Sequence, residues 1–223
     1  MRTIKKVASH IFIDGFGGMT QGLFATLIIG TMIQQIGLLI GGSTGNVIYL
    51  LGKAAAALTS AGIGVGVAVK YGESPLVTVS AAVAAMVSGY AGKITGGTFF
   101  VDGNAVLAGP GEPLGAFIAA FAGITCGHLV SGKTKVDIIV TPVITIGAGS
   151  VVGLLVGPPI SQMMTGLGSI INWATEQRPF IMGIVVSVVM GMVLTLPISS
   201  AALGIILNLS GLAAGAATIG CCC

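Results

Sequence analysis

The sequence predicts an all-α protein, a polytopic transmembrane helical bundle with about six or seven spans. Charged residues make up only 7% of the 223 residues, hydrophobic residues make up 54%, and the apolar residues form long runs. Ordinary soluble domains carry about 25% charged residues. Nine basic and six acidic residues cannot cover the surface of a water-soluble domain of this length, whereas a lipid bilayer accepts apolar surface. We therefore expect a membrane protein and not a soluble enzyme.

Seven apolar runs are the candidate spans, at about 19–41, 45–69, 76–92, 114–131, 137–157, 180–196 and 201–223. A helix rises 1.5 Å per residue and the hydrocarbon core is about 30 Å thick, so these runs can cross it, the third only just. The second run contains Lys53, which we expect to be paired inside the protein or extended toward the membrane surface. The fifth run stops at Gly157-Pro158-Pro159.

Glycines within the runs indicate close helix packing. The sequence has 37 of them, and some recur every four residues: Gly149, Gly153 and Gly157; Gly18 and Gly22; Gly62 and Gly66. In membranes, small residues at this spacing let two helix backbones approach each other closely. We expect these glycines to serve packing and not the binding of a ligand.

Three segments differ from the spans. Residues 93–113 are too polar for a span and too apolar for an ordinary loop, so we expect a re-entrant hairpin buried in protein; a plain external loop is the alternative. Residues 160–178 mix polar and apolar positions around Trp173, and predict an amphipathic helix along the membrane interface. Residues 1–16 could form a second, shorter interfacial helix, on which His10 and Asp14 would share a face.

Basic residues in the loops predict the orientation. With a cytoplasmic N-terminus, six of them fall inside and two fall outside; the six are Arg2, Lys5, Lys6, Lys70, Lys133 and Lys135, and the two are Lys93 and Arg178. Cytoplasmic loops carry the excess of Lys and Arg, so this orientation is favoured.

Glu112 is the strongest candidate for a solute-binding residue. It lies in Gly109-Pro110-Gly111-Glu112-Pro113, just before the fourth run. The glycines and prolines predict an irregular backbone, whose free carbonyl and N–H groups would surround one carboxylate near the membrane. The alternative is a glutamate that caps the first turn of the next helix, where negative charge is favourable.

Two further groups are weaker candidates. Asp102 and Asn104 lie on the same expected hairpin and could hydrogen-bond hydroxyl groups, although both are also ordinary turn residues. Thr195, Ser199 and Ser200 flank Pro197, where a broken helix would expose backbone carbonyls. Alternatively, these hydroxyls satisfy the backbone of their own helix.

Soluble-enzyme motifs are missing from the sequence. It contains only two histidines, His10 and His128, and neither a phosphate-binding loop nor a dinucleotide fingerprint. We expect no catalytic residue, no metal and no cofactor. The scattered basic residues do not predict nucleic-acid binding, so the expected partners are the lipid bilayer and a polar solute.

Several segments resemble the fructose-type enzyme IIC of the bacterial sugar phosphotransferase system. They are Val7-Ala8-Ser9-His10-Ile11 with the glycine-rich run that follows, the Gly-Ala-rich residues 114–123, Ile139 to Pro142 with Val151 to Pro159, and residues 196–202. The resemblance covers most of the chain in order, and the nearest branch includes the perfringolysin O regulator. It implies a single membrane-embedded domain over residues 1–223; the alternative is a domain that is incomplete at its C-terminus.

The same resemblance implies a function. An enzyme IIC protein in the bacterial plasma membrane binds a sugar and presents it to a cytoplasmic IIB phosphocarrier, and such proteins are generally homodimers. Here Ser199-Ser200 replaces the Asn-Lys of the family, which removes a charge from a polar site. We therefore keep two alternatives: a membrane regulator or sensor without transport, and a carrier or channel for a non-sugar solute.

Overall fold

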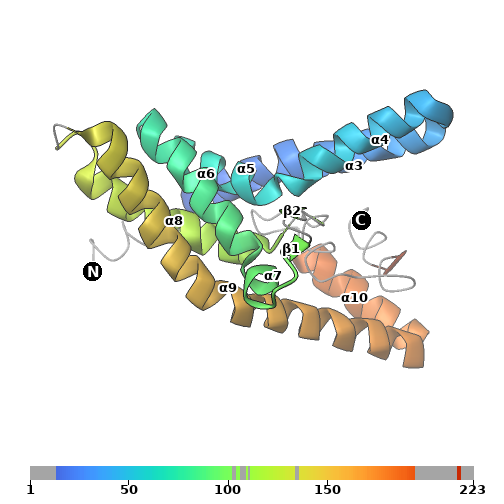
Figure 1. Cartoon of the computed structure of the whole chain (residues 1–223). Helices are drawn as coiled ribbons and strands as arrows, with labels where there is room; N and C mark the ends of the chain where they lie inside the picture. Colours follow the sequence, from blue (N-terminus) through green and yellow to red (C-terminus); the bar gives the residue numbers. More distant parts are fainter. Residues whose placement is uncertain are drawn as a thin grey trace. The chain divides into compact units, whose positions relative to one another are not determined.

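The computed structural model describes residues 14–101, 104–105, 109, 111–133, 136–193 and 215–216 (Figure 1). The chain divides into two compact units, Met1–Pro159 and Ile160–Cys223. His10 and the rest of the expected N-terminal interfacial helix, apart from Asp14, Gly15 and Phe16, lie outside the described residues.

Helices make up nearly all of the described chain, which confirms the all-α class. They are α2 (Phe16–Leu23), the π-helical turn η2 (Phe24–Ile28), α3 (Ile29–Ile40), α4 (Gly42–Ala57), α5 (Thr59–Lys70), α6 (Pro75–Gly89), α7 (Ala91–Thr95), α8 (Pro113–Val130), α9 (Asp137–Gln177) and α10 (Pro179–Val193). Two-residue strands β1 (Phe100–Val101) and β2 (Asn104–Ala105) pair antiparallel between α7 and α8.

Three helical segments of the described chain are long and apolar enough to cross a membrane: Phe16–Ile40, Pro113–Val130 and Asp137–Met163. A fourth span results if α4 and α5, bent by 53° at their junction, are counted together. The runs at 76–92 and 180–196 correspond to shorter apolar helices. The 15 residues of α6 extend about 22 Å, less than the hydrocarbon core. The seventh run is described only at residues 215–216.

Paired glycines hold the first two runs together as antiparallel helices. A methyl group on all but one of them would strike the backbone of the opposite helix, and at Gly62 it would strike the Thr26 side chain. The pairs are Gly18 with Gly66, Gly22 with Gly62, Gly30 with Gly52, and Gly37 with Gly45. Gly41 and Gly42 form the tight turn between the two runs at φ of 65° and 66°, a region that favours glycine. The packing role predicted for Gly18, Gly22, Gly62 and Gly66 is confirmed.

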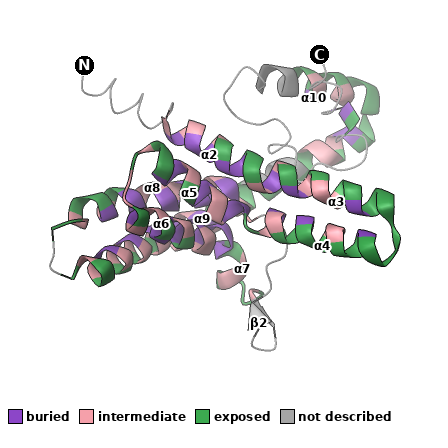
Figure 2. Ribbon diagram, turned by 90° about the horizontal axis from the view of Figure 1, so that it is seen from above, coloured by how far each residue is buried: buried purple, intermediate pink, exposed green. Residues whose placement is uncertain are grey.

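The hairpin of α3 and α4, which we call the arm, packs chiefly on itself. Most of its large apolar side chains are exposed, whereas α5, α6 and α8 bury small residues against one another (Figure 2). In α9, Gly149, Gly153 and Gly157 face Ala84, Ser88 and Ala91 of the α6–α7 segment. This contact confirms the packing role predicted for the third set of glycines.

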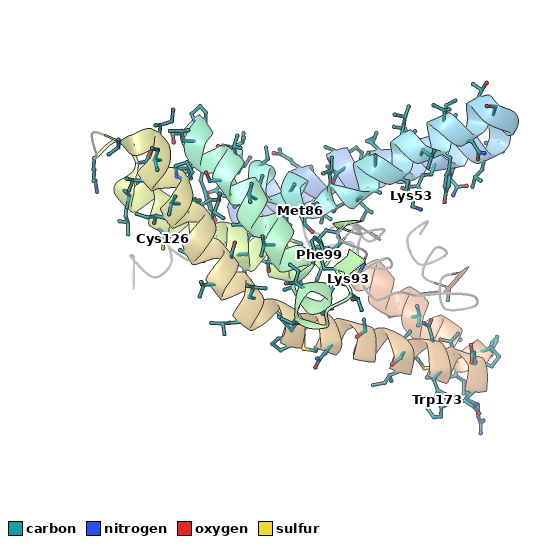
Figure 3. The ribbon with its side chains drawn as sticks, in the orientation of Figure 1. Lys53, Met86, Lys93, Phe99, Cys126 and Trp173 are labelled. Carbon is teal, nitrogen blue, oxygen red and sulfur yellow. The ribbon has the colours of Figure 1, made fainter. Side chains whose placement is uncertain are left out.

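Two boundaries differ from the sequence-based expectation. The second run is interrupted at Leu58, where the Thr59 hydroxyl donates to the carbonyl oxygen of Ala56 at 2.6 Å. The fifth run does not stop at the prolines, because α9 continues through Pro158 and Pro159 to Gln177. Proline in a membrane helix is tolerated when neighbouring groups satisfy the freed carbonyls. Residues 160–177 are therefore the end of a longer helix, on which Trp173 is exposed (Figure 3).

Candidate functional site

Four helix ends meet at one place in the first unit. The N–H of Glu112, just before α8, donates to the carbonyl oxygen of Gly89 at the end of α6, at 2.8 Å. The Tyr90 hydroxyl lies 3.0 Å from the carbonyl oxygen of Ala57, the last residue of α4. Ser60, in the first turn of α5, lies against both Gly89 and Gly111. The two helix starts and two helix ends are therefore directly connected.

Tyr90 is the central polar contact of this site. Its side chain is almost fully buried, at 1% exposure. Its hydroxyl lies 2.6 Å from the carbonyl oxygen of Gly109 as well as 3.0 Å from that of Ala57. A phenol has one proton to donate, so one of these two carbonyls at a time can accept it.

The Ser60 side chain lies between two glycines, Gly89 at the end of α6 and Gly111 in the loop before α8. A methyl group at Gly111 would lie 2.5 Å from Ser60 Oγ, and one at Gly89 would collide with the same side chain. Gly111 also has a φ of 76°, which side chains other than glycine rarely adopt. The loop before α8 can therefore follow this path only with glycine beside Ser60.

Glu112 is buried, at 8% exposure, and its Oε1 accepts a hydrogen bond from the N–H of Leu114 at 3.1 Å. This bond caps α8, as the alternative interpretation of Glu112 expected. Among the residues that the structure describes, Oε2 has no hydrogen-bond partner. Glu112 precedes the spanning helix, and burial raises the pKa of its carboxyl while the Leu114 N–H opposes that rise.

The helix ends give the site both signs of partial charge. Helix starts present free N–H groups and helix ends present free carbonyls. Here the starts of α5 and α8 lie beside the ends of α4 and α6. Interrupted helices that meet in this way bind polar solutes in membrane transporters. The arrangement is suited to a solute with several hydroxyl groups.

Residues 93–113 leave the helices and return at the same point. The segment begins in α7, forms the β1–β2 pair, and ends beside Gly89. Phe99 lies with its ring centroid 5.7 Å from that of Tyr90, and Lys93 Nζ lies 5.3 Å from the same ring (Figure 3). The excursion thus packs on the tyrosine of the site, as a hairpin does. Its depth in the membrane stays a prediction.

The other predicted site residues are not brought to Glu112 by the described chain. Asn104 lies in β2, where it pairs with Val101. Asp102, Thr195, Ser199 and Ser200 lie outside the described residues, and their roles stay predictions. Sequence reasoning missed Tyr90 and Ser60. The available signal was a lone tyrosine among small residues, Ser88-Gly89-Tyr90-Ala91-Gly92.

A second polar cluster lies at the opposite end of α6 and α8. Here His128 Nδ1 lies 3.0 Å from Glu73 Oε1, and the hydroxyls of Ser74 and Ser131 lie 3.2 Å apart. Burial raises the pKa of the nearby Tyr71, and Asp14 raises it further. The start of α2, the α5–α6 turn and the α8–α9 turn therefore lie at the same end of this unit.

Comparison with known proteins identifies one family. The family model described as "Phosphotransferase system, EIIC" matches residues 13–223. No curated protein and no solved structure matches the chain.

Proposed function

The chain belongs to the enzyme IIC family of the phosphotransferase system, and we propose that it is the permease-like membrane subunit that binds and translocates a sugar or related polar solute. In this proposal a cytoplasmic IIB protein supplies the phosphoryl group. The chain itself positions the solute, keeps it from bulk water and releases it for phosphorylation. The membrane component of such a system needs no self-contained active site.

One observation carries the proposal: the buried carboxylate of Glu112 lies where four helix ends meet, and its Oε2 has no hydrogen-bond partner in the described chain. A carboxylate only accepts hydrogen bonds, and sugar hydroxyls can donate them. A bond to a charged acceptor contributes about 1.5–3 kcal/mol, more than a neutral one. Glu112 would therefore select a solute rich in donors.

The remaining predicted residues complete the proposed site. Asp102 and Asn104 belong to the excursion that packs on Tyr90, and Thr195, Ser199 and Ser200 belong to the segment around Pro197. We propose that they supply further hydrogen bonds to the solute.

Orientation and assembly are part of the proposal. We place the N-terminus in the cytoplasm of a bacterial cell and the bundle in its plasma membrane. The contacts Glu73–His128 and Ser74–Ser131 support a common side for the α5–α6 and α8–α9 turns, which carry Lys70 and Lys133. We propose a homodimer, as is general in this family. Its mass in detergent, determined by light scattering, tests that state.

The proposed function is tested in proteoliposomes that contain this chain as their membrane protein. Sugars, sugar alcohols and ascorbate are added on one side, and a phosphorylated IIB protein of the fructose type is enclosed on the other. We expect the phosphate ester of at least one solute to accumulate inside, and none in liposomes without the chain. Free diffusion of unmodified solute through the protein would contradict the proposal and favour a non-sugar carrier or channel.

A regulator or sensor is the second candidate function. Ser199-Ser200 stands where the family has Asn-Lys, and the resemblance extends to the branch of the perfringolysin O regulator. Such a protein would bind its solute without turnover. In the same proteoliposomes, saturable binding without accumulation of a phosphate ester would favour this function.

A further inference from the structure

Two irregularities of the first two runs lie opposite each other. The π-helical turn η2 interrupts the first run at Phe24–Ile28, and the second run bends by 53° at Leu58. The two are in contact, because a methyl group at Gly62, whose N–H donates to the carbonyl oxygen of Leu58, would lie 2.6 Å from Thr26 Cγ2. Single π turns within helices occur frequently at functional sites, and irregular stretches inside a helix often mark hinges.

On each side of the contact between η2 and the break at Leu58, paired glycines make a tightly packed helix pair. On one side Gly18 and Gly22 pack α2 against α5, and on the other side Gly30 and Gly37 pack α3 against α4 in the arm. Small residues that allow backbone contact leave little freedom within a pair. The place where η2 faces Leu58 therefore lies between two tightly packed helix pairs, and it is where we expect any bending to occur.

At each irregularity a threonine hydroxyl adds a hydrogen bond to a backbone carbonyl. The Thr26 hydroxyl donates to the carbonyl oxygen of Gly22 at 2.7 Å, and the Thr59 hydroxyl donates to that of Ala56 at 2.6 Å. Such bonds allow a helix in a membrane to break without leaving unsatisfied backbone groups. Thr26 and Thr59 therefore each contribute a side-chain hydrogen bond at the two irregularities.

Tyr90 connects this hinge to the solute loop. Ala57, at the arm side of the break, and Gly109, in the loop that leads to Glu112, both present a carbonyl oxygen to the one hydroxyl of Tyr90. If the arm bends, Ala57 moves with α4. The Tyr90 hydroxyl then donates more often to the carbonyl oxygen of Gly109 when Ala57 moves away, and less often when Ala57 moves closer. Two residues of this loop, Gly109 and Gly111, adopt positive φ, a region that favours glycine.

We propose that Tyr90 is a positioning residue that couples the angle of the arm to the position of the Gly109–Glu112 loop. The proposal rests on the proposed function, since that loop carries the solute-binding carboxylate. Solute binding at Glu112 then favours one arm angle, and an arm held at another angle weakens binding.

Tyr90→Phe tests the coupling, because it removes the hydroxyl and keeps the ring against Phe99. Tyr49→Phe is the matched control, since its hydroxyl has no hydrogen-bond partner in the described part of the chain. Spin labels at Ser43, in the arm, and Lys133, in the α8–α9 turn, report the arm angle without any sugar. All four cysteines are replaced by serine in this background.

The second readout is the rate at which dicyclohexylcarbodiimide labels Glu112, measured by mass spectrometry. We expect Tyr90→Phe to broaden the Ser43–Lys133 distance distribution and to raise the labelling rate roughly two- to tenfold, the range expected for the loss of one hydrogen bond. Tyr49→Phe should match the parent in both. Parent-like distances and labelling in Tyr90→Phe would overturn the coupling.

A hinge variant covers the case in which Tyr90→Phe does not fold. Thr26→Val removes a hydroxyl of the hinge that does not touch the loop, and Thr125→Val removes the same kind of intrahelical bond in α8. We expect faster labelling of Glu112 in Thr26→Val only, and equal rates would refute the coupling. Neither readout needs a sugar, so a failure here is distinct from a failure of Glu112 to bind one.

Discussion

The backbone N–H of Glu112 donates to the carbonyl oxygen of Gly89 at 2.8 Å, which joins the start of α8 to the end of α6. At the other end of the same two helices, the hydroxyls of Ser74 and Ser131 lie 3.2 Å apart. The pair α6–α8 is therefore fixed at both ends. The polar excursion between Gly89 and Glu112 projects from one end only, the end at which the helices α4 and α5 also break.

The buried Glu112 carboxyl should make the stability of the protein depend on pH. Its pKa is raised from the ordinary value of 4.5 by burial. The folded state therefore holds this proton more tightly than the unfolded state, and stability is lost as pH rises from about 4.5 through the raised value. Glu112→Gln should remove that loss, so its unfolding temperature relative to wild type should increase with pH over this window.

The measurement is thermal unfolding in detergent across the pH range, with Glu176→Gln, an exposed carboxylate, as control. A parallel pH profile for Glu112→Gln and wild type would show that burial does not perturb this carboxyl.

Gly22 should be far less tolerant of alanine than Gly17, although both lie in α2. A methyl group at Gly22 would meet the backbone of Gly62, whereas the nearest atom at Gly17 is Lys70 Cε at 3.8 Å. Overpacking of this kind costs about 1–3 kcal/mol, and alanine otherwise favours a helix. We expect Gly22→Ala to lower the unfolding temperature and Gly17→Ala to leave it equal or higher. Equal losses in the two variants would contradict the glycine pairing.

Ser60 should tolerate removal of its hydroxyl better than added bulk. Valine at this position would press on Gly89 and Gly111, which already meet the serine side chain, at a cost of about 1–3 kcal/mol. Alanine removes the hydroxyl without a steric conflict. We expect Ser60→Val to unfold at a lower temperature than Ser60→Ala. The reverse order would contradict the close contact of Ser60 with Gly89 and Gly111.

The Glu73–His128 pair should contribute little to stability. His128 is 70% exposed whereas Glu73 is 10% exposed, and Nδ1 lies 3.0 Å from Glu73 Oε1, so the pair faces water on its histidine side. Exposed pairs are worth about 0–1 kcal/mol and weaken further in salt. Glu73→Gln should therefore change the free energy of unfolding by less than about 1 kcal/mol, with a smaller effect at high ionic strength. A larger loss, unchanged by salt, would assign this pair a structural role.

Composition and glycine spacing were enough to predict the all-α membrane class and the packing of Gly149, Gly153 and Gly157. The position of Glu112 before Pro113 was enough to suggest a helix cap as the alternative to solute binding. These features follow from local chemistry. The break at Leu58 could not be predicted in this way, because its neighbours Ala57 and Thr59 include neither glycine nor proline. The contact of η2 with α5 lies opposite this break.

The candidate site was only partly visible in the sequence for the same reason. Tyr90 joins Ala57 to Gly109 across long sequence separations, and a single sequence carries no sign of such pairings. The continuation of α9 through Pro158 and Pro159 was missed because proline was taken as a stop. A proline ends a membrane helix only where no neighbouring group satisfies the carbonyls that it frees.

Binding of sugars to Glu112→Gln tests the central claim most directly. Equilibrium binding to purified protein is measured for a panel of sugars, sugar alcohols and ascorbate, with Glu176→Gln as the matched control. We expect at least one solute to bind the wild type and the control equally, and to bind Glu112→Gln at least about tenfold more weakly, as loss of a charged hydrogen bond predicts. Equal affinity in Glu112→Gln, or no binding of any solute to the wild type, would contradict the assignment of this site.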